Sequence, residues 1–136
     1  MKKLITIILA VLMCVSLAAC GKKGETKQSF AGKYLLTEMQ SGSESYTEFL
    51  KSSWEDKSFY EYFEITEDNR ISAYSVTDGN RQTLMEYYFD PETKGVFEDE
   101  EMKKQTSDVL TFEGDTITMT SGDSTFKLVK TDEIPY

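Results

Sequence analysis

The chain has 136 residues, with 15 lysines and arginines against 24 acidic residues, a net charge of −9 and no histidine. The acidic balance argues against a nucleic-acid partner, because phosphates need a basic surface. Without histidine, and with only two cysteines, the usual Ser-His, Cys-His and zinc sites cannot be assembled. We therefore expect a protein that is not an enzyme and holds no cofactor or metal.

The first 20 residues have the features of a targeting segment. Lys2 and Lys3 precede an apolar run from Leu4 to Val15, and small residues follow. This run is shorter than the ~20 apolar residues of a spanning helix, and the pattern predicts a secretory signal peptide. Removal of residues 1–19 takes away two lysines and no acid, which leaves 117 residues, the size of one domain, with a net charge of −11.

The end of that segment, Leu17-Ala18-Ala19-Cys20, resembles the lipobox of bacterial lipoproteins. The resemblance implies cleavage before Cys20 and transfer of a lipid to its sulfur, with palmitate-type acyl chains holding the protein in the cell membrane, on the extracytoplasmic side. An ordinary secretory signal with a chance cysteine is the alternative. Residues 20–29 are Gly- and Lys-rich and predict a flexible tether, and residues 30–136 are expected to form the folded domain.

The folded part consists mainly of short runs rich in aromatic and β-branched residues, separated by turn sequences such as Asp78-Gly79-Asn80 and Glu113-Gly114-Asp115. Because short connections favour antiparallel neighbours, we expect an all-β, eight-stranded up-and-down barrel or half barrel. The eight predicted strands are Lys33–Met39, Phe59–Thr66, Arg70–Val76, Thr83–Phe89, Gly95–Glu98, Asp108–Phe112, Thr116–Thr120 and Thr125–Lys130.

One segment breaks the strand pattern. Ser45 and Glu48 fit a capping box, and Phe49, Leu50 and Trp54 recur at helical spacing, which predicts a short helix from Tyr46 to Ser53. Two interpretations remain open at this point. The helix either closes one end of the barrel with ordinary core residues or forms a lid over a ligand cavity.

The opening of the first strand, Phe30-Ala31-Gly32-Lys33-Tyr34, resembles the Gly-x-Trp start of lipocalins, with Tyr34 in place of Trp. This resemblance implies a lipocalin-like β-barrel, as in the lipocalin-like domains of small bacterial lipoproteins. Lipocalins also pack a late-strand arginine on the Trp. Here the last strand offers only Lys127 or Lys130 for that position.

Tyrosines are concentrated in three consecutive predicted strands. A tyrosine combines apolar area with a polar tip, which suits a small amphipathic ligand or a glycan, and equally an exposed sheet face that binds an envelope protein. The same residues also form good cross-strand pairs in any sheet. If Phe59, Phe63 and Ile65 point inward, alternation makes Tyr60 and Tyr62 point outward. The candidate ligand-binding residues are Phe49, Trp54, Tyr60, Tyr62, Tyr74, Tyr87 and Tyr88.

The segment from Asp90 to Glu101 matches an EF-hand loop at positions one, three, six and twelve. Lys94 occupies position five, where a ligand oxygen belongs, so we expect no calcium site. The alternative is a hairpin turn in which Pro91 sets φ and Gly95 supplies a positive φ, followed by a solvated acidic run over residues 98–101.

Two further kinds of site are compatible with the residue types present. Glu61 and Glu86 lie among hydrophobic neighbours and could form a carboxylate pair for glycoside hydrolysis, but their spacing does not select a pair. The methionines of the folded part are scattered, which favours core filling over a copper site. They are Met39, Met85, Met102 and Met119.

Overall fold

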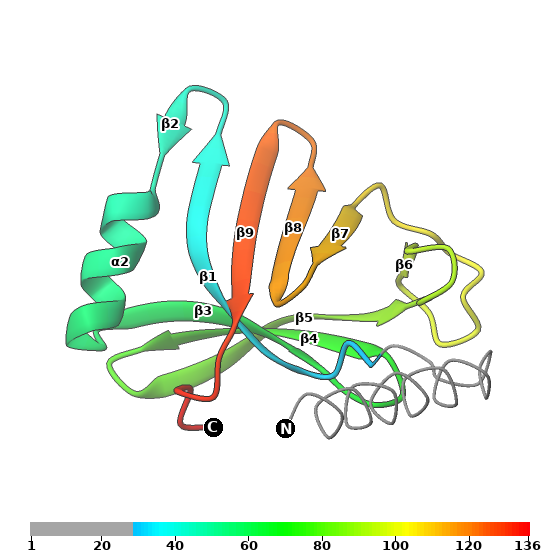
Figure 1. Ribbon diagram of the computed structural model, residues 1–136, viewed down its shortest axis with the longest axis horizontal. Coiled ribbons are helices and arrows are strands. Elements are labelled where there is room, and N and C mark those ends of the chain that lie inside the picture. The colour runs from blue at the N-terminus through cyan, green and yellow to red at the C-terminus, as the bar shows by residue number, and fades with distance from the viewer. Residues whose placement is uncertain (1–28) are drawn as a thin grey trace, which may run out of the picture.

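The computed structural model describes residues 29–136. All eight predicted strands are present (Figure 1), and a further strand, β2, pairs with the end of β1. The expectations for residues 1–28, which include the signal peptide, Cys20 and most of the tether, lie outside the described residues. The elements are β1 (Gly32–Ser41), β2 (Glu44–Ser45), α2 (Thr47–Asp56), β3 (Phe59–Ile65), β4 (Arg70–Thr77), β5 (Asn80–Phe89), β6 (Val96–Phe97), β7 (Val109–Glu113), β8 (Thr116–Ser121) and β9 (Ser124–Lys130).

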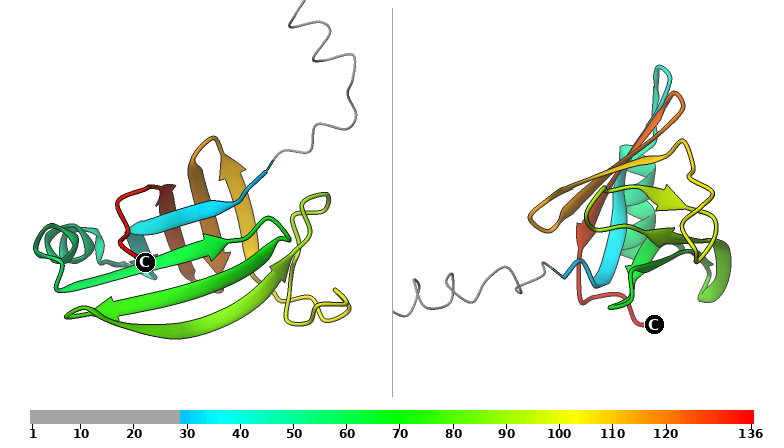
Figure 2. Two further views of the ribbon diagram at one scale, coloured as in Figure 1. Left: turned by 90° about the horizontal axis from the view of Figure 1, so that it is seen from below. Right: turned by 90° about the vertical axis from the view of Figure 1, so that its right-hand side faces the viewer.

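The strands form one antiparallel sheet in the order β6-β5-β4-β3-β1-β9-β8-β7. Pairing of β1 with β9 joins the first long strand to the last one, so the sheet curls into a nearly closed barrel (Figure 2). The remaining seam lies between β6 and β7, the two ends of this order. The predicted all-β, up-and-down barrel is therefore confirmed. Within residues 29–136, no helix is long and apolar enough to cross a membrane.

The barrel interior is densely filled near β6 and β7. The rings of Phe30, Phe89 and Phe112 contact one another, with centroids 4.3 to 5.5 Å apart. Val96, Leu110 and several aliphatic residues from other strands belong to the same buried cluster. Burial of an aliphatic or aromatic side chain stabilises a fold by about 1.5–3 kcal/mol, so this cluster contributes substantially to stability.

Tyr34, near the start of β1, contacts both the segment before the strand and the end of β9. The Tyr34 hydroxyl donates a hydrogen bond to the Phe30 carbonyl across 2.7 Å, and the Lys130 ammonium lies 5.9 Å from the Tyr34 ring centroid. Of the two lysines that the last strand offers beside Tyr34, Lys130 is the one near the ring, whereas Lys127 pairs with Glu38. Gly32 has a φ of +147°, a backbone conformation that other residues rarely adopt, which explains the glycine at this position.

The predicted capping box at α2 is wrong. Tyr46 is the N-cap residue and makes no side-chain capping bond, while the Ser45 hydroxyl donates to the Thr47 hydroxyl. Ser45 is instead part of β2, paired with Gln40, one residue too early to cap the helix. The helix also continues three residues beyond its predicted end, to Asp56.

Candidate binding cavity in the barrel interior

Tyr60 and Tyr62 point away from the barrel interior, as the alternation in β3 predicts, but they are not exposed. Their exposed fractions are 4% and 0%, so the predicted exposure of these tyrosines is wrong. The physical reason is that the helix α2 and the segment after β9 cover them. Trp54 of α2 packs against Tyr60 with ring centroids 5.0 Å apart, and Ile134, beyond β9, is buried in the same cluster.

Arg81 of β5 closes this outer cluster. Its guanidinium donates a hydrogen bond to the Tyr62 hydroxyl across 3.2 Å and lies 4.6 Å from the Tyr74 ring centroid and 5.0 Å from that of Tyr136. Burial raises the pKa of the Tyr62 hydroxyl, and the hydrogen bond from Arg81 partly opposes that shift. The outer face of β3 and β4 is therefore a second small core. The C-terminus lies against this side of the sheet (Figure 2).

The other candidate residues lie elsewhere. Tyr87 packs against the main core, and Tyr88 lies beside Arg70, whose guanidinium is 5.7 Å from the Tyr88 ring centroid. Phe49 is 54% exposed, with its ring 5.7 Å from that of Phe59. The seven aromatic residues thus divide among the outer cluster, the barrel interior and the surface, and do not form one site.

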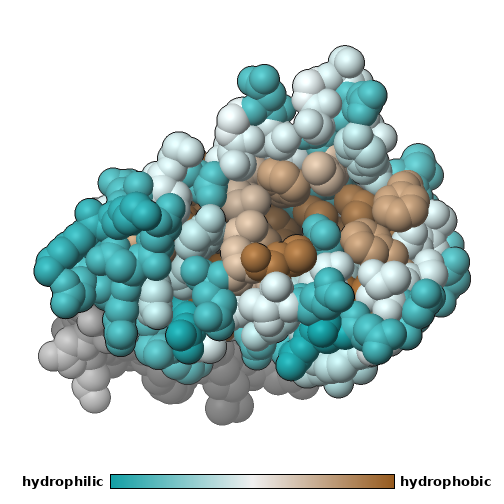
Figure 3. All heavy atoms as spheres, turned by 180° about the vertical axis from the view of Figure 1, so that it is seen from behind, coloured by the Kyte–Doolittle hydropathy of each residue, from teal (hydrophilic) through white to brown (hydrophobic). Residues whose placement is uncertain are grey.

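The interior contains a cavity of about 80 Å³ in the part that the phenylalanine cluster leaves open. Seen from behind, apolar side chains gather in a hollow at the centre of the molecule (Figure 3). Residues of six strands line the cavity, and no residue of α2 does, which counts against a helical lid. The lining residues are Leu36, Glu61, Tyr62, Phe63, Ala73, Tyr74, Leu84, Met85, Met119, Phe126 and Leu128. Of the seven candidate ligand-binding residues, Tyr62 and Tyr74 border this cavity, although their rings pack in the outer cluster.

The register of β3, β4 and β5 explains why the interior is open here. Ala73 lies opposite both Phe63 and Met85, so the middle strand contributes only a methyl group between two larger side chains. Leu84 is an extra residue in β5 at a bulge, where the register shifts between Ala73 and Tyr74. Leu84 is 50% exposed and marks where the cavity meets solvent.

A row of polar residues crosses the sheet at Glu61, which is the member of the row that lines the cavity. Glu61 lies opposite Ser75 in β4, and Ser75 lies opposite Gln82 in β5. Since Phe59 and Phe63 pack against the main core, alternation directs Glu61 inward as well. Burial raises the pKa of the Glu61 carboxyl. The sequence suggests Glu61 only for a carboxylate pair that the spacing does not select. The pattern that could have placed it in the cavity lining is a charged residue between two inward-facing phenylalanines, Phe59 and Phe63.

Glu61 and Glu86, the two acids considered for a carboxylate pair, do not come together. Glu86 lies opposite Ser72 and next to Met85, which lines the cavity, so Glu86 points to the outer face and is exposed. Glu61 and Glu86 are therefore on opposite sides of the sheet. Of the methionines, Met85 and Met119 line the cavity, Met39 packs against the main core, and Met102 is largely exposed.

The segment that resembles a calcium loop forms a turn. The Asp90 carboxylate accepts hydrogen bonds from the Glu92 N–H across 2.9 Å and from the Thr93 hydroxyl across 2.8 Å. Lys94, and not Gly95 as expected, has the positive φ of 64°. Position 95 favours glycine for a different reason, because a Cβ there would lie 2.9 Å from the Phe97 ring. Among residues 29–136, no group of three acidic or cysteine side chains is placed to hold a metal ion.

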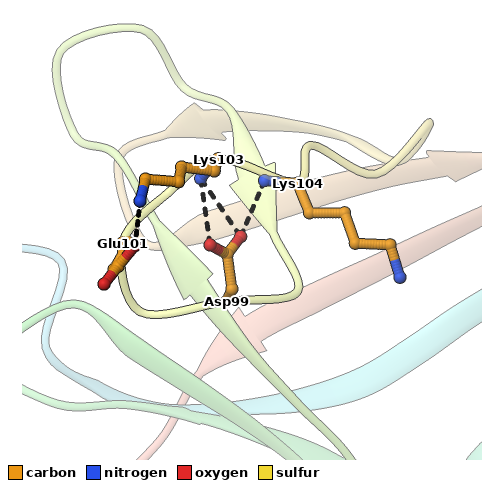
Figure 4. Close-up of polar contacts among 4 residues, drawn as sticks. All are labelled: Asp99, Glu101, Lys103 and Lys104. Carbon is orange, nitrogen blue, oxygen red and sulfur yellow. Dashed lines mark hydrogen bonds and ion pairs between the residues drawn. The ribbon is translucent and has the colours of Figure 1, made fainter.

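The acidic run after β6 is folded back on itself. The Asp99 carboxylate accepts hydrogen bonds from the backbone N–H groups of Lys103 and Lys104 (Figure 4), the shortest being 2.7 Å. These bonds, mainly the one from Lys104, lower the Asp99 pKa. Lys103 forms an ion pair with Glu101. This run is thus an ordered turn beside the barrel seam, whereas the sequence predicted only solvated acids.

No family model, no curated protein and no solved structure matches this chain.

Proposed function

We propose that this protein is a lipid-anchored, extracytoplasmic binding module for a small amphipathic molecule and that it carries out no reaction. The observation that carries the proposal is the apolar cavity inside the barrel, with Glu61 as the one charged residue of its lining. An apolar hollow with a few polar groups at its edge is the usual form of a small-molecule site. A glycan fits this lining less well, because a sugar needs many hydrogen-bond partners.

The anchor in this proposal rests on the sequence alone. The segment from Met1 to Cys20 has the order of a signal peptide, and its last four residues resemble the bacterial lipobox. A mature net charge of −11 gives no electrostatic attraction to anionic lipids, so the acyl chains on Cys20 would supply the attachment. The barrel would then be held near the outer surface of the cell membrane.

The alternative is an envelope protein that binds a partner through an exposed tyrosine-rich face. Burial of Tyr60 and Tyr62 beneath Trp54 and Ile134 removes the surface on which that alternative depends. The cavity is therefore the better-supported site. The absence of histidine from the chain supports binding over catalysis, since histidine is the side chain that most often transfers protons near neutral pH.

Ligand entry can be measured with methionine methyl groups as reporters. The full chain is placed in zwitterionic lipid nanodiscs with isotope-labelled methionine methyl groups and titrated with n-pentanol as the probe. We expect the resonances of Met85 and Met119 to shift, because both side chains line the cavity. The resonance of Met102, in the exposed loop after β6, serves as the internal control.

Two substitutions test whether the cavity itself is occupied. Ala73→Leu fills it and should abolish the Met85 shift, with Ala73→Val as a milder variant if the leucine overpacks the core. Thr120→Leu adds a leucine on the exposed face of β8 and should leave the shift unchanged. The proposal is overturned if pentanol shifts no cavity methionine in the unaltered protein, or if Ala73→Leu leaves the response intact.

A further inference from the structure

We propose that the ligand of the interior cavity is a short aliphatic amine, whose alkyl chain occupies the apolar space and whose ammonium group pairs with the Glu61 carboxylate. This inference rests on the proposed function, because it requires that the cavity be a binding site. Three observations support it: the size of the cavity, the charge of its lining and the register of the polar row.

The size restricts the apolar part of the ligand. The cavity of about 80 Å³ is roughly half the ~150 Å³ of an apolar cavity that admits benzene. A short alkyl chain fits between Leu36, Met119 and Leu128, whereas a fatty acid or a sterol does not. The half-exposed Leu84 at the edge leaves the polar end of such a ligand near solvent.

The charge of the lining selects the head group. Glu61 is the one acidic residue that lines the cavity, where it lies with no lysine or arginine. Among the described residues, its carboxylate takes part in no hydrogen bond and no ion pair. Lys127, between the cavity residues Phe126 and Leu128, points to the other face and pairs with Glu38 across 3.4 Å. A partly desolvated carboxylate without a partner is stabilised by a cation.

The register places polar side chains, and no cationic one, beside Glu61 on the cavity side of the sheet. An ammonium has three N–H donors. Ser75 lies opposite Glu61 in the neighbouring strand β4, and Gln82 follows opposite Ser75 in β5. An alcohol offers one donor and no charge. An anionic head group meets the Glu61 carboxylate and a protein of net charge −9, both of which oppose its binding.

The test compares three probes with the same chain and different head groups. The full-length protein in zwitterionic nanodiscs is titrated with n-pentylamine, n-pentanol and pentanoate, and the Met85 and Met119 methyl resonances report occupancy. Because a hydrogen bond to a charged group contributes more than a neutral one, we expect pentylamine to bind about tenfold more tightly than pentanol. Pentanoate should bind most weakly.

Glu61→Gln is the decisive variant, because it keeps the shape of the side chain and removes its charge. It should abolish the preference for the amine while pentanol binding persists. Glu64→Gln is the matched control, since Glu64 is in the same strand on the opposite face and lies opposite Lys33. The Glu64→Gln variant should prefer pentylamine over pentanol to the same degree as the unaltered protein.

The outcomes separate this inference from the proposed function. Equal binding of the three probes, or a preference that survives in Glu61→Gln, overturns the amine assignment and leaves a binding cavity. If none of the probes moves the Met85 or Met119 resonance, both the amine assignment and the proposed function fail.

Discussion

Arg81 of β5 donates a hydrogen bond to the hydroxyl of Tyr62 in β3, across 3.2 Å and over the intervening strand β4. Between them lies Tyr74, whose ring stacks on that of Tyr62 at 5.1 Å and lies beneath the guanidinium. One arginine thus holds together three strands and the C-terminal Tyr136. The outer aromatic cluster is a packed unit, and its stability should depend on this residue.

Arg81→Ala should lower the free energy of unfolding, because it removes a hydrogen bond to Tyr62 and two cation–π contacts. Urea unfolding followed by Trp54 fluorescence measures the change. Arg70→Ala is the control. Arg70 lies 5.7 Å from the Tyr88 ring on the surface, and its loss should cost less. Equal losses for the two variants would contradict the role assigned to Arg81.

Ile134 provides the second test of the outer cluster. Ile134→Ala should destabilise the protein by about 2–4 kcal/mol, since the side chain is 5% exposed and packs in the cluster of Tyr60 and Tyr62. Ile134→Val should cost about 1 kcal/mol. Chemical denaturation gives both values. A loss below about 0.5 kcal/mol for Ile134→Ala would mean that residues 131–136 do not cover the sheet in solution.

The stability of the folded protein should depend on pH through the Glu61 carboxyl. Burial raises its pKa in the folded state, so the folded protein binds this proton more tightly than the unfolded chain does. The stabilisation that comes from the protonated Glu61 carboxyl is therefore fully present below its pKa in the unfolded chain. It is lost as the pH rises through its higher pKa in the folded protein. Glu61→Gln should melt at a higher temperature than the unaltered protein at neutral pH. The difference should shrink below about pH 4, the unfolded range of a glutamate, and a constant difference would contradict this origin.

Cys20→Ser should prevent lipid attachment, because it removes the sulfur nucleophile that the lipobox resemblance assigns to the acylated residue. Metabolic labelling with a palmitate analogue should mark the unaltered protein and not this variant. Cys14→Ser is the matched control, since Cys14 lies in the segment expected to be removed. Label retained in Cys20→Ser, or lost in Cys14→Ser, would refute the assignment.

Calcium should not stabilise the turn from Asp90 to Gly95 selectively. The Asp90 carboxylate already accepts bonds from Glu92 and Thr93, and the Lys94 ammonium lies 4.3 Å from the Phe30 ring centroid beside the turn. Calcium and magnesium should shift the melting temperature alike, by screening the acidic surface. A calcium-specific rise at sub-millimolar concentration that Asp90→Asn removes would reveal a metal site.

The pattern of the sequence determined much of the fold. Alternating residues and turn dipeptides act over a few positions, so the eight strands and the helix could be located without tertiary contacts. The same period of two placed Tyr60 and Tyr62 on the face opposite to Phe63. The composition of the chain, which includes no histidine, also limits the possible chemistry by itself.

Only the tertiary structure decided which faces are covered and where space remains. The alternation of side chains along β3 places Tyr60 and Tyr62 on the same face. Their burial, however, depends on Ile134, which lies more than 70 positions further along the chain. The cavity likewise requires six strands at once, with Ala73 between two larger side chains and Glu61 at its edge. Such long-range packing leaves no local signal, because residues that meet only after the barrel curls impose no spacing on one another in the sequence.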